Sequence, residues 1–389
     1  MNSKTQFISS EAILEKLVAF DTTSRHPNLA LVEYVTGLLE KHGIASTLLH
    51  NNEKTKANLY ASAGPKVEGG VMLSGHTDVV PIDGQDWTYP AFKMTKDKQR
   101  LYGRGTADMK GFVACAIAAL VKSTAHQLQT PLHLALSYDE EIGCVGVHSL
   151  LDMLNNAPTK PGMCIVGEPT QLQVATKHKG KLAVLAHCRG TEGHSALAPH
   201  YQNAIHLACD LVGILRSVQD KIVAQVPHDA QADIPFTTIH VGRINAAQAL
   251  NIVPNLCTVN FEIRHPASDD PLKILEGIKI QAKELAEKAK LKFPTVEICF
   301  DILNSYPALD TPVDSQVVKF VQSLLKTDQT SFVAFGTEAG LFSSEVGIPT
   351  VVCGPGSMNQ GHKPDEYLEL HQLQQCDRLL DQLIARLIT

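Results

Sequence analysis

The sequence predicts an α/β protein whose main domain is a mostly parallel sheet with helices on both faces. Four apolar runs of strand length alternate with stretches of helical pattern, and such alternation favours a parallel sheet that is covered on both sides. The expected strands are residues 70–75, 132–137, 163–167 and 350–353. The helices between them are expected to include residues 110–123 and 145–154.

A second, smaller domain is expected within the first. With 389 residues, the chain is long enough for two domains of unequal size. From residue 177 the order becomes strand, helix, strand, strand, helix, strand, which is typical of a ferredoxin-like α+β fold. We expect these elements at residues 181–189, 204–221, 237–241, 258–264, 271–290 and 295–302. The main domain is then residues 1–176 and 303–389, with residues 177–302 as the insertion.

The composition narrows the class of protein. A hydrophobic content of 44% and a net charge of −6 describe a globular chain without the basic stripe that a nucleic-acid partner would need. The longest apolar stretch, residues 111–121, is about half of a membrane span, and the first residues lack the apolar core of a signal peptide. Nine scattered cysteines without a C-x-x-C pair favour reduced thiols. We expect a cytoplasmic protein with no membrane partner.

Acidic and histidine residues gather where the expected strands end. A surface carboxylate pair such as Glu140–Glu141 is usually only solvated, but this pair directly follows an apolar strand. His76 and Glu168 follow strands in the same way, Asp108 lies between a Gly-rich turn and a helix, and His362 is in the loop after the fourth strand. Ligands of parallel sheets bind beyond the carboxyl ends of the strands. Together these placements favour a functional site.

The residue types at this site indicate two metal ions. Two imidazoles and three carboxylates suit zinc, cobalt or manganese. The absence of a suitable thiolate argues against a structural zinc site. Five protein ligands exceed the three or so that one catalytic zinc takes, so two metals sharing a carboxylate fit better. Asp108 is the natural bridging ligand, although spacing alone leaves this open. Such metals activate water for hydrolysis at neutral pH.

Five segments in this order resemble the co-catalytic zinc aminoacylase and carboxypeptidase family, which includes acetylornithine deacetylases and succinyl-diaminopimelate desuccinylases. The resemblance spans residues from about 70 to 370, and every ligand position of the family pattern is present. The segments are Ser-Gly-His-Thr-Asp-Val-Val-Pro at 74–81, Gly-Arg-Gly-Thr-Ala-Asp-Met-Lys-Gly at 103–111, Asp-Glu-Glu at 139–141, Gly-Glu-Pro-Thr at 167–170 and Gly-His at 361–362.

The resemblance implies a role for each residue of the site. One zinc, or cobalt, would be held by His76, Asp108 and Glu168, and the other by Asp108, Glu141 and His362. Two further residues would be catalytic: Glu140 as the general base, and Asp78 as the residue that orients the site, although Asp78 could also be a simple turn residue. The family also implies a cis peptide bond after Asp108.

The inserted domain is implied to bind substrate and to form a homodimer, closing over the site as a lid. His194 would reach the partner subunit's site and stabilise the oxyanion, and Arg264 with Asn251 would bind a substrate carboxylate. Without the resemblance, His194 would be interpreted as a surface or packed histidine, and Arg264 as an exposed charge at a strand end.

The segment Thr337-Glu338-Ala339 resembles the deacetylase branch more than the desuccinylase branch, although Gly340 stands where deacetylases often have proline. This favours hydrolysis of N2-acetyl-L-ornithine to L-ornithine and acetate, a step of arginine biosynthesis, with Thr337 and Glu338 near the substrate and Glu338 a candidate for its ammonium group. Desuccinylase, broader N-acyl-amino-acid hydrolase and dipeptidase activities remain alternatives. So does a non-catalytic homologue that binds metal or an amino acid.

Overall fold

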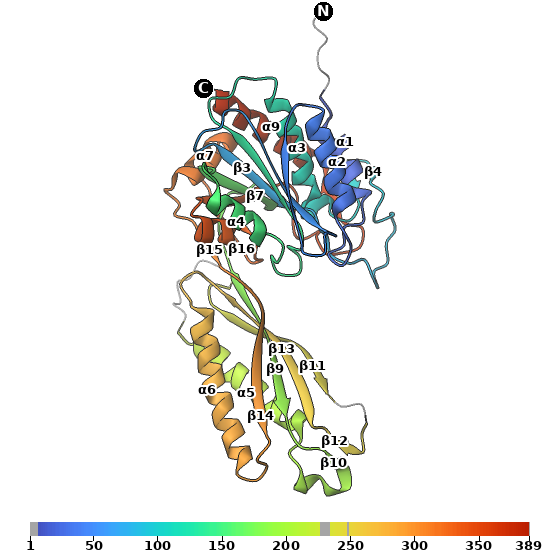
Figure 1. Ribbon diagram of the computed structural model, residues 1–389, viewed down its shortest axis with the longest axis vertical. Coiled ribbons are helices and arrows are strands. Elements are labelled where there is room, and N and C mark those ends of the chain that lie inside the picture. The colour runs from blue at the N-terminus through green and yellow to red at the C-terminus, as the bar shows by residue number, and fades with distance from the viewer. Residues whose placement is uncertain (1–6, 226–233, 247–248, 389) are drawn as a thin grey trace, which may run out of the picture. The chain divides into compact units, whose positions relative to one another are not determined.

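The computed structural model describes residues 7–225, 234–246 and 249–388 (Figure 1). The chain divides into two compact units: Met1–His178 with Asp310–Thr389, called the main unit, and Lys179–Leu309, called the inserted unit. Among the described residues, no helix has both the length and the apolar character that crossing a membrane requires.

A nine-stranded sheet forms the centre of the main unit. Its strands run in the order β1-β2-β6-β3-β7-β17-β8-β15, and β16 pairs with β8. Strand β3 is parallel to both β6 and β7, and β7 is parallel to β17, so these four expected strands form the parallel centre of the sheet. The bounds are β1 (Ser46–His50), β2 (Ala57–Ala63), β3 (Val71–His76), β6 (Leu132–Ser137), β7 (Met163–Pro169), β8 (Ala175–His178), β15 (Leu309–Asp310), β16 (Ser331–Val333) and β17 (Thr350–Gly354).

Helices cover both faces of this sheet, as the sequence predicts. One face carries a continuous apolar core shared with α1 (Ser10–Val18), α2 (Leu29–Glu40), α3 (Gly111–Ser123), α7 (Gln316–Leu325) and α9 (Leu370–Ile388). Helix α3 is apolar along most of its length and packs against α1 and α9 (Figure 1). Helix α4 (His148–Asn156) lies on the other face, where Asn58 of β2 donates hydrogen bonds to Gly146 O and Ser149 Oγ.

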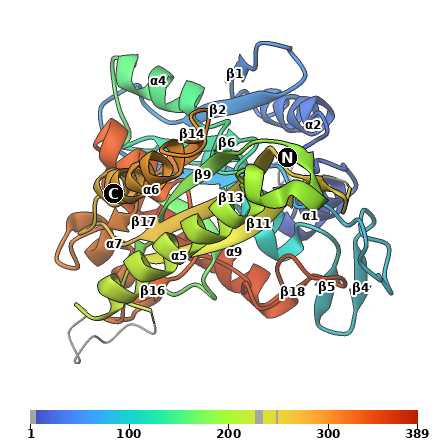
Figure 2. The same ribbon diagram turned by 90° about the horizontal axis from the view of Figure 1, so that it is seen from below.

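A small antiparallel sheet in the main unit was not expected from the sequence. It consists of β18 (Tyr367–Glu369), β5 (Arg100–Tyr102) and β4 (Thr95–Asp97), side by side in Figure 2. Tyr367 pairs with Tyr102, so the chain that leads into the Asp108 turn lies beside the chain that leaves the His362 loop. This sheet therefore brings together two parts of the expected site that are far apart in the sequence.

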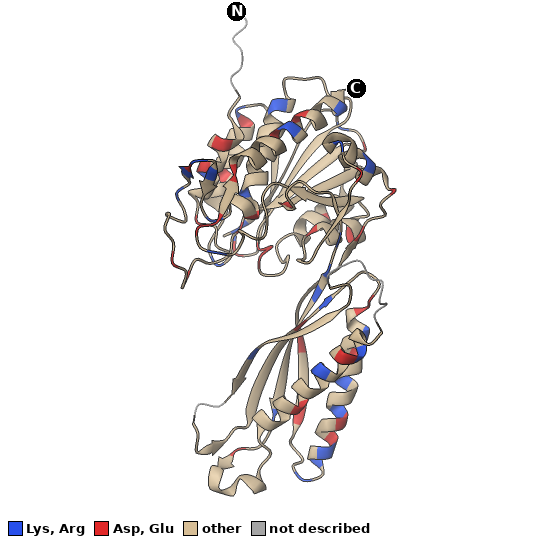
Figure 3. Cartoon of the chain, turned by 180° about the vertical axis from the view of Figure 1, so that it is seen from behind, with Lys and Arg blue, Asp and Glu red and all other residues tan. Residues whose placement is uncertain are grey.

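The inserted unit contains the expected strand and helix order. Its sheet runs β11-β13-β9-β14, and all neighbours are antiparallel. Its helices pack against each other and share one core with the sheet. A short pair, β10 (Gly193–His194) with β12 (Ile252–Val253), holds the Gly-His-Ser loop. The main elements are β9 (Gly180–Arg189), α5 (Ala204–Val223), β11 (Thr238–Ala246), β13 (Leu256–His265), α6 (Pro271–Lys290) and β14 (Glu297–Tyr306). Acidic and basic residues are interspersed along α6 (Figure 3).

The far boundary of the insertion differs from the expected residue 302. Strand β14 does not end there, because after an irregularity between Ile302 and Asn304 its pairing with β9 continues to Tyr306 opposite Lys181. The compact unit then ends at Leu309. A bulge in a strand interrupts the alternation of apolar residues, and the sequence pattern therefore placed the end too early.

Candidate metal centre

The topology of the sheet brings three of the expected ligands to one edge. Strand β3 ends in His76 and lies between β6 and β7. Glu168 is near the end of β7, and Glu141 follows β6 after a turn in which Asp139 has a φ of 57°. Because the three strands are parallel, their carboxyl ends meet. Because Gly167 has no side chain, the Phe112 ring can lie directly against the backbone of β7. A Cβ at position 167 would be 1.9 Å from Cγ of Phe112.

Asp108 lies between two histidines that come from distant parts of the chain. Its Oδ1 is 3.2 Å from His76 Nε2, and its Oδ2 is 3.1 Å from His362 Nε2. The peptide bond from Asp108 to Met109 is cis, as the resemblance implies. Each carboxylate oxygen thus faces a different imidazole, which is the arrangement that a bridging ligand needs.

The five expected ligands form two overlapping groups that could each hold a metal ion. The first is His76, Asp108 and Glu168, and the second is Asp108, Glu141 and His362. Within each group the ligand atoms lie within 4.8 Å of one another. His362 Nε2 is 3.0 Å from Glu141 Oε2, and His76 Nε2 is 3.7 Å from Glu168 Oε1.

The chemistry of these groups fits cations. Among the described residues, no donor reaches the buried Oε1 of Glu141, which leaves a carboxylate oxygen without a partner. Asp108 and Glu168 are also buried, at 5% and 4% exposed. Several buried carboxylates in one place are costly unless positive charge compensates them. Imidazole nitrogen and carboxylate oxygen together suit zinc, cobalt or manganese.

The same crowding of charged groups shifts the pKa values of the expected ligands. Hydrogen bonds to Asp108 and Glu141 raise the pKa of His362 to about 10. Burial, and then the charge of Asp108, raises the pKa of Glu141 to about 7. Burial alone would lower the pKa of His76, but hydrogen bonds to Asp108 and Asp78 raise it well above its ordinary value. A metal ion would compete with protons for these ligand atoms.

Glu140 lies beside the ligands without belonging to either group. Burial, only partly offset by the charge of His76, raises the pKa of the Glu140 carboxyl well above its ordinary value. Its Oε1 accepts a weak hydrogen bond of 3.5 Å from the Cys144 thiol. A raised pKa makes a carboxylate a stronger proton acceptor, which is the property that a general base needs.

Asp78 is a buried anchor for the Glu140–Glu141 turn. Its carboxylate accepts hydrogen bonds from the backbone N–H groups of Glu140 at 3.1 Å and Glu141 at 3.3 Å. Its backbone carbonyl is 2.9 Å from His76 Nδ1, which leaves Nε2 directed at Asp108. The family resemblance implies that Asp78 orients the site, and its contacts include the turn that carries Glu140 as well as His76.

Two supporting residues near the N-terminus were missed by the sequence analysis. The Ser24 hydroxyl donates to Asp78 Oδ2 over 2.6 Å, and Asn28 Nδ2 donates to Thr77 Oγ1 over 3.1 Å. Single Ser and Asn residues in a polar stretch carry no local signal of such contacts. The isolated bridge between Thr23 and Val79 brings this segment to the site.

Thr337 and Glu338 are both buried in the main unit, at 0% and 1% exposed. Thr337 Oγ1 accepts a hydrogen bond from Ala339 N, which shapes the loop locally. Burial raises the pKa of Glu338 to about 7, and its charge acts on Glu140. Among the described residues, Glu338 Oε1 has no hydrogen-bond partner.

The remaining expected residues belong to the inserted unit. His194 is exposed, and its Nδ1 accepts a hydrogen bond from Ala196 N. Asn251 is exposed, and its carbonyl accepts from Ser195 N, so both residues shape one loop. Arg264 on β13 is held by Glu262 Oε1 at 3.1 Å and by the Tyr306 hydroxyl at 2.8 Å.

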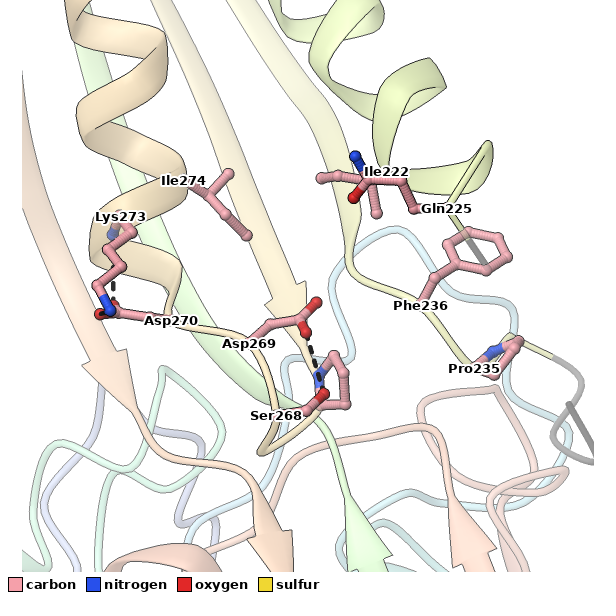
Figure 4. A pocket seen from close by; sticks show the side chains of 10 residues that line it. Ile222, Gln225, Pro235, Phe236, Ser268, Asp269, Asp270, Lys273 and Ile274 are labelled. Carbon is pink, nitrogen blue, oxygen red and sulfur yellow. Dashed lines mark hydrogen bonds and ion pairs between the residues drawn. The ribbon is translucent and has the colours of Figure 1, made fainter. Parts of the chain in front are cut away.

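The inserted unit also contains a cavity of about 660 Å³ (Figure 4). Phe236, Asp269 and Lys273 are among its lining residues, and Asp269 accepts a hydrogen bond from the Ser268 hydroxyl. None of the residues expected at the site lines this cavity. It therefore adds nothing to the metal centre.

Comparison with known proteins supports the resemblance that the motifs carry. Residues 72–386 match the model of peptidase family M20/M25/M40. The chain is 34% identical over 331 residues to the acetylornithine deacetylase of Salmonella arizonae, which covers 85% of this chain and 83% of that protein.

Solved structures share the fold at lower identity. An M20 family metallo-carboxypeptidase from Sulfolobus solfataricus is similar with a TM-score of 0.77 and 18% identity, covering 100% of this chain and 99% of that one. Human carnosine dipeptidase 1 is similar with a TM-score of 0.72 and 14% identity, covering 97% of each chain.

Proposed function

This chain belongs to peptidase family M20/M25/M40 and is a metal-dependent amidohydrolase, and we propose that it hydrolyses N2-acetyl-L-ornithine to L-ornithine and acetate. The observation that carries the proposal is the pair of ligand groups that share Asp108, with Glu140 beside them. The choice of substrate is supported by the 34% identity to an acetylornithine deacetylase over 85% of the chain.

The proposal assigns five residues to two metal ions, most suitably zinc, with cobalt as an alternative. His76, Asp108 and Glu168 would hold one ion, and Asp108, Glu141 and His362 the other. Bound metal ions would polarise the acyl carbonyl and lower the pKa of water toward neutrality. Asp78 holds His76 and the Glu140–Glu141 turn in the orientation that ligation requires.

Glu140 would move the proton. Its carboxylate accepts a proton from the attacking water and returns it to the departing amine, so the amine leaves in neutral form. Burial raises the pKa of the Glu140 carboxyl, which makes its carboxylate a stronger proton acceptor than an ordinary glutamate. The Cys144 thiol and the Asp78 contacts limit the directions in which this carboxylate can point.

Substrate recognition would involve the inserted unit. A guanidinium fork matches a carboxylate bidentately, so Arg264, together with Asn251, would bind the α-carboxylate of the acylated amino acid. His194 would stabilise the oxyanion that forms at the acyl carbon, a contribution worth about 2.7–4 kcal/mol at comparable sites. Thr337 would shape the loop of Glu338, and the Glu338 carboxylate, whose Oε1 has no hydrogen-bond partner among the described residues, would receive the side-chain ammonium of ornithine.

The proposal also includes a cytoplasmic homodimer in which His194 acts in the partner's site. A mixture of two inactive variants tests this. The subunit with His194→Ala retains Glu140, and the subunit with Glu140→Gln supplies His194, so mixed dimers regain one working site. Random mixing should restore about one quarter of wild-type activity. If the mixture stays inactive although the subunits exchange, His194 does not act across the dimer.

A substrate panel tests the activity. The metal-loaded enzyme is given N2-acetyl-L-ornithine, N-succinyl-diaminopimelate, other N-acetyl amino acids and dipeptides, and kcat/KM is compared. We expect the highest kcat/KM for acetylornithine. An absence of turnover on acetylornithine, with fast cleavage of the succinyl compound or of a dipeptide, would refute the assignment and support that alternative.

A further inference from the structure

Glu366 is a buried acidic residue that holds the turn carrying Asp108. Its side chain is 1% exposed. Oε1 accepts hydrogen bonds from the backbone N–H groups of Ala107 at 2.9 Å and Asp108 at 3.1 Å, and Oε2 accepts from Gly105 N at 3.0 Å. Buried backbone N–H groups need an acceptor, and one carboxylate serves three of them in this turn.

Arg104 extends this network to the loop that carries His362. Its Nη1 donates to Glu366 Oε2 over 2.7 Å and to the Lys363 carbonyl over 3.3 Å. Its Nη2 donates to Gln85 Oε1 over 2.6 Å, and Gln85 Nε2 donates to the His362 carbonyl over 3.0 Å. A continuous set of hydrogen bonds thus joins the backbone of one expected ligand to the backbone of another.

The stability of the fold alone does not account for such a pair. Both side chains are 1% exposed, and taking two charges out of water costs about as much as their attraction returns. An apolar pair of similar volume would often stabilise the protein as well. What an apolar pair cannot provide is a fixed acceptor for three N–H groups together with a planar fork of donors aimed at a second loop.

The network contacts Asp108 and His362, the two expected ligands that lie in a turn and a loop and not at the end of a central strand. His76 and Glu168 are at the ends of central strands, where the sheet already fixes them. Asp108 lies in a non-helical turn, and His362 is in a loop with a φ of 61° and a side chain that is 46% exposed. Sites on loops hold their geometry less well than sites on strands unless other contacts support them.

We propose that Arg104 and Glu366 are positioning residues that keep the Asp108 carboxylate opposite the His362 imidazole, and so retain the metal ion between them. The inference rests on the metal ligation proposed above and is independent of the substrate. Loss of the pair should weaken the ion held with His362 before the ion held with His76 and Glu168, because only the group that contains His362 has two ligands, Asp108 and His362 itself, on loops that the network supports.

Two substitutions in the pair test this by metal affinity. Glu366→Gln keeps the shape but turns an amide NH2 toward backbone N–H donors. Arg104→Lys keeps the charge but cannot contact Glu366 and Gln85 together. Each should weaken binding of one zinc ion by about 10- to 100-fold, the usual effect of losing a contact that orients a ligand. Zinc affinity is measured by competition with a chromophoric chelator, and activity should return at high zinc concentration.

The neighbouring strands offer a matched control. Arg100 and Glu369 form an ion pair of 3.0 Å on the same two strands, β5 and β18, but their side chains are 45% and 31% exposed. Glu369→Gln makes the same chemical change a few residues away, outside the network. This variant should bind zinc like the wild type.

The outcomes separate this inference from the proposed ligation. If the wild type itself binds no zinc, the ligation fails. If the wild type binds two ions and Glu366→Gln binds both with unchanged affinity, the positioning role is wrong. Should Glu366→Gln and Arg104→Lys fail to fold, Gln85→Ala decides, because Gln85 is only half-buried and contacts the His362 carbonyl directly. Weaker binding of one ion by Gln85→Ala supports the inference, and wild-type affinity overturns it.

Discussion

The hydroxyl of Ser24 donates a hydrogen bond to the Asp78 carboxylate over 2.6 Å, and both side chains are buried. Ser24 belongs to the N-terminal segment, before the first of the recognisable motifs, whereas Asp78 follows β3. The contact fixes the carboxylate that anchors both His76 and the Glu140–Glu141 turn. The segment around Ser24 therefore contributes to the metal centre, although it lies outside the motifs that carry the family resemblance.

Removal of this hydroxyl should reduce turnover without emptying the site. In Ser24→Ala, the Asp78 carboxylate loses the Ser24 donor but keeps the backbone N–H groups of Glu140 and Glu141, and a hydrogen bond to a charged group is worth about 1.5–3 kcal/mol. We expect kcat to fall about tenfold, with little change in KM or in metal content. The control is Thr23→Val, since the Thr23 hydroxyl donates to Asp21 instead. Equal losses in both variants would mean that the segment acts only through general stability.

Metal binding should release protons, and metal affinity should rise with pH. In the metal-free site His362 has a pKa of about 10 and Glu141 of about 7, so at neutral pH the first is protonated and the second is half protonated. Ligands must lose these protons before they bind a metal ion. Calorimetry of zinc binding in buffers of different protonation enthalpy measures the release. His362→Ala should release fewer protons, and equal release by both proteins would exclude His362 as a ligand.

Lys110 should make the stability of the metal-free protein depend on pH. Burial lowers the pKa of Lys110 to about 7, although its ammonium donates to Leu17 O and Phe20 O. Between pH 7 and 10 the unfolded chain binds a proton that the folded chain has lost, so the free energy of unfolding rises with pH, by at most about 1.4 kcal/mol per unit.

Lys110→Met removes this contribution. The difference in free energy of unfolding between wild type and Lys110→Met should increase from pH 7 to pH 9, as measured by urea denaturation of the metal-free proteins. Lys122→Met serves as the control, because Lys122 is partly exposed and pairs with Asp381 on the surface. If the difference for Lys110→Met does not change with pH, Lys110 is charged throughout this range.

Arg264→Lys should raise KM for an acylated amino acid about tenfold or more, because lysine keeps the charge but loses the bidentate fork. Arg243→Lys, at an exposed position on β11, should leave KM unchanged. N-acetylputrescine, which has no α-carboxylate, provides a control on the substrate side. If Arg264→Lys slows both substrates equally, Arg264 does not bind the carboxylate.

Strand ends were the part of the site that the sequence could predict. His76, Glu141 and Glu168 each follow a run of buried strand residues, so periodicity and sheet topology were sufficient to group them. The proximity of Asp108 and His362 depends on the pairing of β5 with β18. These strands have only three residues each, and their sequences carry no clear alternation of apolar and polar residues. The expected proximity of Asp108 and His362 came from the family resemblance.

Long-range polar contacts were beyond the reach of the sequence. Glu366 follows Asp365 in a polar loop and resembles any surface carboxylate, yet it is 1% exposed. Ser24 is equally inconspicuous. Such contacts depend on which distant segments pack together, and composition and periodicity do not contain that information. The end of the insertion was missed for a similar reason, because pairing between β9 and β14 determines it.

The most direct measurement is a metal titration of the metal-free wild type and of Glu140→Gln, with metal content and hydrolysis of N2-acetyl-L-ornithine followed together. We expect both proteins to bind two zinc ions per chain. Activity of the wild type should appear as the ions bind, whereas kcat of Glu140→Gln should stay about 10²- to 10⁴-fold lower. Wild-type turnover by Glu140→Gln, or full activity of the metal-free wild type, would contradict the proposed mechanism.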